Sequence, residues 1–171
     1  MQPNIYNFFK FLEDKEGRPI PFKIKLIHAP KTLTPDELIV GDNLNLTNTP
    51  ITSLPEGLRV GGDLYLENTP ITSLPDDLQV GDSLDLTNTK ITSLPKGLKV
   101  GGYLDLTNTK ITSLPKGLKV GGYLDLENTK ITSLPDSLKV GGYLNLRNTP
   151  LSNQTDEEIR AGRNIKGEIV R

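Results

Sequence analysis

The chain has 171 residues and a formal net charge of −1 at pH 7, with 35% hydrophobic residues and no cysteine or tryptophan. Its length suggests one domain or one continuous array, and the lack of cysteine excludes disulfides, thiol nucleophiles and cysteine-ligated zinc. The near-zero net charge gives no overall attraction to nucleic acid or to anionic lipid, so we expect neither as a partner.

Residues 1–19 predict an N-terminal helical cap. The helix should begin after Asn4 and end near Gly17. The apolar residues on one of its faces are Ile5, Phe8, Phe9 and Leu12. A helix on a membrane surface is the alternative, but its acidic and basic residues are mixed and leave no basic face. No general secretion signal and no apolar run of roughly 20 residues is present, so we expect a soluble protein. Its compartment stays open, with the cytoplasm of the producing cell or of a host cell favoured.

A period of 20 residues organises the chain from about residue 20 to residue 151. The template is V-G-x-x-L-x-L-x-N-T-x-I-T-S-L-P-x-x-L-x. Its units start at Val40, Val60, Val80, Val100, Val120 and, as a partial unit, Val140, and a faded copy starts near Ile20. Fixed periods of this length are typical of solenoids.

Each unit is interpreted as one coil of a β-rich solenoid. In the unit that starts at Val100, Leu104 and Leu106 alternate with polar residues, which predicts a half-buried strand. Pro115 disfavours a helix in the return leg, and Gly121 permits the corner before the next coil. Because one coil cannot bury its few apolar side chains alone, each must stack on identical side chains of its neighbours.

One pattern within this unit is L-x-L-x-x-T-x-I-x-x-L-P, formed by Leu104, Leu106, Thr109, Ile111, Leu114 and Pro115. The pattern resembles a leucine-rich repeat of the short bacterial or phage-like class, with about 20 residues per repeat. The resemblance covers about residues 20–151 and implies parallel strands on one face. Two positions depart from the family. Thr109 and its equivalents replace the ladder asparagine, although a Thr hydroxyl can still bond the backbone, and Gly101 and its equivalents replace the first leucine. A parallel β-helix is therefore the alternative fold.

Residues 152–171 predict a C-terminal cap. Thr155 and Glu158 form a capping box, which is typical of the start of a helix. Ile165 and Ile169 can then cover the last coil, since a terminal coil otherwise exposes its apolar core.

Outward positions of successive coils align into ladders, and the resemblance implies that the strand face carries binding. The candidate residues for binding a partner are Tyr65, Asp85, Tyr103, Asp105, Tyr123, Asp125, Glu127, Tyr143 and Arg147. Tyrosine offers rigid apolar area with a polar tip, as at protein interfaces. Neighbouring aspartates repel each other, and a partner's basic groups or Ca²⁺ would relieve that repulsion. Duplication of the repeat and screening by water explain the same ladders without any ligand.

These patterns favour a non-catalytic module that recognises another protein through its strand face, without a cofactor or metal. Family analogy suggests an inhibitor or effector that acts on a host factor. The alternatives are a structural spacer, or a module that binds carbohydrate or a Ca²⁺-linked ligand on the Tyr/Asp face. The chain's one histidine, His28, occupies the place of the corner residue Asn48, and no unit brings Ser, Asp and His together for catalysis.

Overall fold

The computed structural model describes residues 4–171. Its helices are α1 (Ile5–Glu16), α2 (Phe22–His28), the 3₁₀ helix η1 (Pro30–Thr32) and α3 (Asp156–Arg160). Sheet 1 contains β1 (Ile39–Val40), β3 (Arg59–Val60), β5 (Gln79–Val80), β7 (Lys99–Val100), β9 (Lys119–Val120), β11 (Lys139–Val140) and β13 (Asn164–Ile165). Sheet 2 contains β2 (Leu44–Asn45), β4 (Leu64–Tyr65), β6 (Leu84–Asp85), β8 (Leu104–Asp105), β10 (Leu124–Asp125), β12 (Leu144–Asn145) and β14 (Ile169–Val170).

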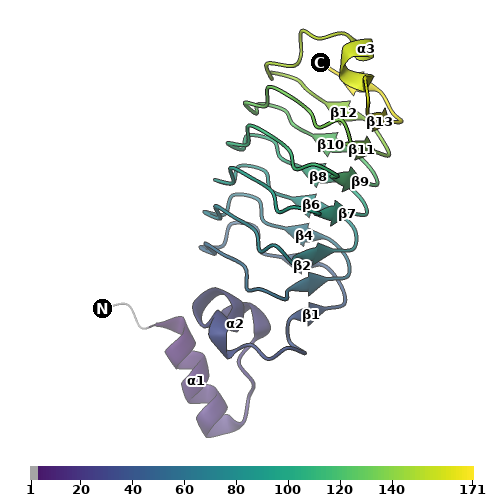
Figure 1. Cartoon of the computed structure of the whole chain (residues 1–171). Helices are drawn as coiled ribbons and strands as arrows, with labels where there is room; N and C mark the ends of the chain where they lie inside the picture. Colours follow the sequence, from purple (N-terminus) through teal and green to yellow (C-terminus); the bar gives the residue numbers. More distant parts are fainter. Residues whose placement is uncertain (1–3) are drawn as a thin grey trace.

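The coils stack along one axis, with α1 and α2 at one end and α3 at the other (Figure 1). Neighbouring strands of each sheet are parallel and pair residues 20 apart, for example Leu104 with Leu124 and Val100 with Val120. The last strand of each sheet pairs residues 25 apart, as in Val140 with Ile165 and Leu144 with Ile169. The predicted β-rich solenoid is confirmed. Its strands lie in two sheets, however, and not on one face alone, because each coil uses a short strand on both sides of its glycine corner.

The core is the set of apolar side chains that repeat at the same position in every coil. Leu104, Leu106 and Ile111 are fully buried, and so are their equivalents in the coils on either side. Complete burial of a side chain of this size contributes roughly 1.5–3 kcal/mol. The stacking of like on like therefore supplies the main driving force for the array.

Asparagine and threonine form the corner after each strand of sheet 2. Asn108 has a φ of 58°, and its five equivalents have similar positive values. Asparagine adopts this left-handed conformation more readily than most residues, which explains its place here. The adjacent Thr109 donates its hydroxyl hydrogen to the Leu106 carbonyl at 2.7 Å. This bond confirms the expected role of threonine at the corner.

Helix α1 begins and ends, and α3 begins, at the residues that the sequence predicts. The Asn4 side chain accepts a hydrogen bond from the Tyr6 N–H at 3.1 Å, and Gly17 ends α1 in the left-handed conformation with a φ of 65°. Thr155 and Glu158 form the capping box that starts α3. The segments β13 and β14 then add a last strand to each sheet.

The faded repeat near residue 20 does not form a coil. Its residues 22–28 form α2 where the repeat pattern predicts an extended segment, although Leu26 is buried in the core as expected. A strand at this end would leave one edge without a partner, whereas a helix satisfies its own backbone groups and still covers the first coil. No helix within residues 4–171 is long and apolar enough to cross a membrane.

Candidate partner-binding site

Three stacked tyrosines form a row beside the first residues of sheet 2. The ring centroids of Tyr103 and Tyr123 lie 4.8 Å apart with planes 3° from parallel. Those of Tyr123 and Tyr143 lie 4.1 Å apart at 19°. Tyr103 is 53% exposed and Tyr123 is 39% exposed. The repeat places these rings at the strand spacing of about 4.8 Å, so stacking is a direct consequence of the register.

Three aspartates form a second row on the same sheet. Oδ1 of Asp85, Asp105 and Asp125 each accepts a hydrogen bond, at 2.8 to 2.9 Å, from the backbone N–H two residues further on. Asn45 and Asn145 accept the equivalent bond at 2.9 and 3.1 Å. Asn and Asp both accept this bond, and Tyr65 stands at the same position without it, so the turn does not need a negative charge there.

Asn145 occupies the next place in the aspartate row, and its side chain is buried. Its Nδ2 donates to Oδ1 and Oδ2 of Asp125 at 3.1 and 3.0 Å, and to Oε2 of Glu127 at 3.1 Å. These bonds hold Asp125 and Glu127 in place and leave them fewer free oxygens for a partner. Asp85 and Asp105, further along the row, make no such bond with a neighbouring side chain within residues 4–171.

Both rows line one groove of about 670 Å³. Seven of the nine predicted residues contribute to it: Tyr65, Asp85, Tyr103, Asp105, Tyr123, Asp125 and Tyr143. Glu127 and Arg147 lie beyond its lining. The groove also contains Asp63, Asp82 and Ser83, which sequence reasoning did not select. The sequence could have indicated Asp63 and Ser83, because they occupy the tyrosine position in the two preceding coils.

A hydrogen-bonded pair closes one end of the groove. The Tyr65 hydroxyl donates to Oδ2 of Asp63 at 2.8 Å, and the Ser83 N–H donates to Oδ1 at 2.9 Å. The bond from the Ser83 N–H, and next the bond from Tyr65, lower the pKa of Asp63, and the bond to Asp63 raises the pKa of Tyr65. Asp63 therefore favours folding above its unfolded pKa, and this contribution is lost as the pH falls through the lower folded value.

At the other end of the tyrosine row, Tyr143 is the least accessible ring. Loss of solvent raises the pKa of its hydroxyl, and the nearby carboxylate of Asp125 raises it further. The hydroxyl therefore stays protonated near neutral pH and can donate a hydrogen bond to a ligand in the groove.

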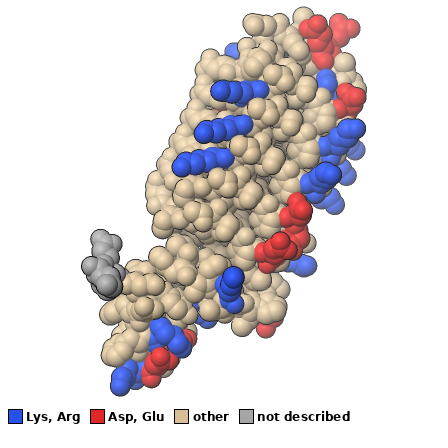
Figure 2. Space-filling model, turned by 60° about the vertical axis from the view of Figure 1, so that its left-hand side comes forward, with Lys and Arg blue, Asp and Glu red and all other residues tan. Residues whose placement is uncertain are grey.

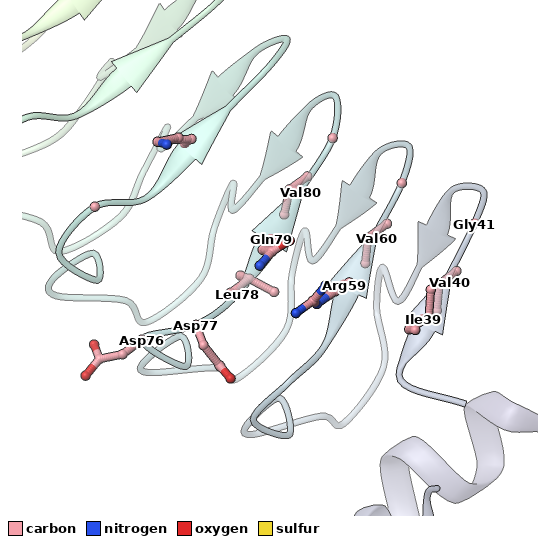
Figure 3. A pocket seen from close by; sticks show the side chains of 14 residues that line it. Ile39, Val40, Gly41, Arg59, Val60, Asp76, Asp77, Leu78, Gln79 and Val80 are labelled. Atoms are coloured by element: carbon pink, nitrogen blue, oxygen red, sulfur yellow. The ribbon is translucent and has the colours of Figure 1, made fainter. Parts of the chain in front are cut away.

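Sheet 1 carries a second groove of about 680 Å³ with different chemistry. Figure 3 shows Arg59 and Gln79 on neighbouring strands, with Asp76 and Asp77 at the turn below them. Oδ2 of Asp77 accepts a hydrogen bond from the Gly57 N–H at 2.8 Å, so one of these acids connects two coils. Because this groove mixes both charge signs and contains no aromatic residue, it is the weaker candidate for recognition.

The remaining charged residues are distributed over the outside of the solenoid. Figure 2 shows basic side chains in a row along its axis. Lys90, Lys110 and Lys130 repeat at one exposed corner position. His28 is exposed at the end of α2, and no group of three or more His, Asp or Glu within residues 4–171 is arranged to hold a metal ion.

Comparison of the whole chain with protein-family models gave no match, and comparison with curated proteins gave no significant relative.

Proposed function

We propose that this protein is a non-catalytic recognition module that binds a basic segment of another protein in the sheet 2 groove. The observation that carries this proposal is the row of stacked tyrosines alongside the row of aspartates in one groove. Aromatic rings supply rigid contact area, and carboxylates select basic groups. The 20-residue coils with Leu-Pro in the return leg support assignment to the short leucine-rich repeats. Analogy with that class extends the proposal to an inhibitor or effector of a host factor.

The charge of the aspartate row supports a basic partner. Asn45 and Asn145 make the same turn as Asp85 and Asp105, so an uncharged row would fold equally well. Like charges on neighbouring strands destabilise a sheet slightly. Basic side chains of a bound partner would remove that cost.

A structural spacer is the second candidate, and one observation favours it. The rings of Tyr103 and Tyr123 lie against a glycine of the next coil, the ring of Tyr143 stacks on Tyr123, and each aspartate accepts a backbone hydrogen bond. Under this alternative the two rows serve only local stability, and removal of the rings changes no binding.

Binding of short peptides separates the two candidates. We would screen basic, neutral and acidic peptides by fluorescence anisotropy against the wild type and a variant carrying Tyr103→Ser, Tyr123→Ser and Tyr143→Ser. The matched control carries Lys99→Ser, Lys119→Ser and Lys139→Ser on sheet 1. We expect basic peptides to bind at least tenfold more weakly to the tyrosine variant and without loss to the lysine variant. Equal binding to all three folded proteins, with folding verified by circular dichroism, would support the spacer.

A further inference from the structure

The rings of Tyr103 and Tyr123 each rest over the second glycine of the coil that follows. A Cβ atom on Gly122 would lie 3.0 Å from Cδ1 of Tyr103. A Cβ on Gly142 would come closer still to the ring of Tyr123. These glycines therefore form a flat floor on which an aromatic ring lies against the backbone.

The same floor is present one coil earlier, but no ring covers it. Above Gly102 lies only the small Ser83 side chain, whose Oγ is 2.5 Å from the place of a Cβ. Ser83 uses this oxygen to accept a hydrogen bond from the Tyr103 N–H at 3.1 Å. The position where the tyrosine row would continue is thus open, and we name it the Ser83 slot, bounded by Ser83, Gly102 and Tyr103.

The wall of the Ser83 slot is the free face of an aromatic ring. Tyr103 stacks on Tyr123 on one side only, and it is the more exposed of the two at 53% against 39%. The slot is continuous with the sheet 2 groove, whose lining includes Ser83, Gly102 and Tyr103. A planar group entering there would stack on Tyr103 at the spacing that the neighbouring rings already show.

Two carboxylates border the Ser83 slot. Asp82 and Asp85 both line the groove beside it. Asp85 uses Oδ1 for the Thr87 N–H at 2.8 Å and leaves Oδ2 without a protein donor within residues 4–171. Asp82 is exposed, and no ion pair involves either residue in that part of the chain. The ligand that suits this place is therefore planar and positively charged.

We propose that the Ser83 slot binds the guanidinium group of an arginine side chain of the partner protein. A guanidinium is planar, stacks on aromatic faces and donates paired hydrogen bonds to carboxylates, whereas the ammonium of lysine is a compact point charge. This assignment rests on the proposed recognition function and specifies one residue type within the basic segment.

Two small probes test the slot directly: the blocked tripeptides Ac-Gly-Arg-Gly-NH₂ and Ac-Gly-Lys-Gly-NH₂. Titration of the ¹⁵N-labelled protein is followed by amide chemical shifts. We expect the arginine probe to shift the amides of Ser83, Gly102 and Tyr103, with at least fivefold tighter binding than the lysine probe. Equal binding of both probes, or no shift of these amides at 20 mM arginine probe, would overturn the assignment.

Ser83→Tyr fills the slot with the ring that the neighbouring coils carry, and Gly102 already provides its floor. We expect this variant to lose at least 80% of the arginine-induced shifts. The matched control is Asn43→Tyr, which adds a ring over Gly62 and leaves the Ser83 slot open. A second variant, Asp85→Asn, keeps the turn as Asn45 does and removes the charge. It should weaken binding of the arginine probe about threefold to tenfold.

The outcomes distinguish a failure of the slot assignment from a failure of the proposed function. If Ser83→Tyr binds the arginine probe as the wild type does, the slot assignment is wrong. The groove would still be a recognition site if the variant without the three tyrosines loses basic peptides. If that variant also binds them normally, both proposals fail.

Discussion

Glycine at the corner between the two sheets decides how closely two coils approach. A Cβ atom on Gly121 would lie 2.9 Å from the carbonyl carbon of Gly101 and closer still to its oxygen. The same holds at Gly61, Gly81, Gly101 and Gly141, whereas a Cβ on Gly41 meets nothing within 4 Å because no coil precedes it. This position therefore requires glycine for steric reasons, since any side chain would push the neighbouring backbone away.

The pair Gly121→Ala and Gly41→Ala tests this argument. We expect Gly121→Ala to lower the free energy of unfolding by roughly 1–3 kcal/mol, which is typical of overpacked sites. Gly41→Ala should leave stability within about 0.5 kcal/mol of the wild type, as for surface substitutions. Urea unfolding followed by circular dichroism measures both. A similar loss in the two variants would contradict the close-approach explanation.

At the scale of an element, arginine side chains hold α3 to the last coils: Arg160 donates to the Ile165 and Gly167 carbonyls, and Arg163 makes further bonds. The Arg163 guanidinium donates to the Leu134 carbonyl at 2.7 Å and to the Glu158 and Ile159 carbonyls at 3.1 and 3.0 Å. The short helix buries only Ile159. Arg163 thus satisfies free carbonyls at the end of α3 and ties this helix to the return leg of an earlier coil.

Replacement of Arg163 by alanine should loosen the C-terminal cap alone. We expect a loss of roughly 1–3 kcal/mol of local stability, because these hydrogen bonds involve a charged group. Hydrogen exchange of residues 156–170 measures the loss, and exchange of residues 40–120 should stay unchanged. The control is Lys166→Ala, which removes an exposed basic side chain of the same cap. Faster exchange throughout the array would show that the cap is not a separate unit.

At the scale of the whole molecule, the solenoid is a row of nearly interchangeable coils. The hydrogen bonds between coils, such as the Leu104 N–H to the Tyr123 carbonyl at 2.9 Å, recur every 20 residues. Each coil contacts mainly its two neighbours, so stability is approximately a sum over coils and over the interfaces between them. Removal of one full period keeps every remaining residue at its proper position.

Deletion of residues 100–119 joins Lys99 to Val120 and preserves the register. We expect this shorter chain to fold, with the same shape of circular dichroism spectrum and a thermal midpoint lower by a few degrees. The control is a deletion of residues 105–114, which removes half a period and misplaces every following core residue. Cooperative unfolding of this control would contradict an array specified by register.

Much of the candidate groove could be predicted from the sequence. The tyrosine and aspartate rows follow from the period, since residues 20 apart must lie side by side once the coils stack. The Ser83 slot could not be predicted in this way. The slot depends on the orientation of the Tyr103 ring and on the open space above the Gly102 backbone. The spacing of the repeat alone predicts neither of these features.

The sequence by itself determined the solenoid, its core positions, both ends of α1 and the start of α3. These features depend on neighbours along the chain or on the same position in the next coil, so a periodic pattern contains them. Only the tertiary structure decided that residues 22–28 are helical, because a helix at the end of the array satisfies its own backbone groups, whereas a strand would leave one edge unpaired. It also decided that the strands form two sheets and that Tyr103 keeps one open face, since both depend on how whole coils meet in space.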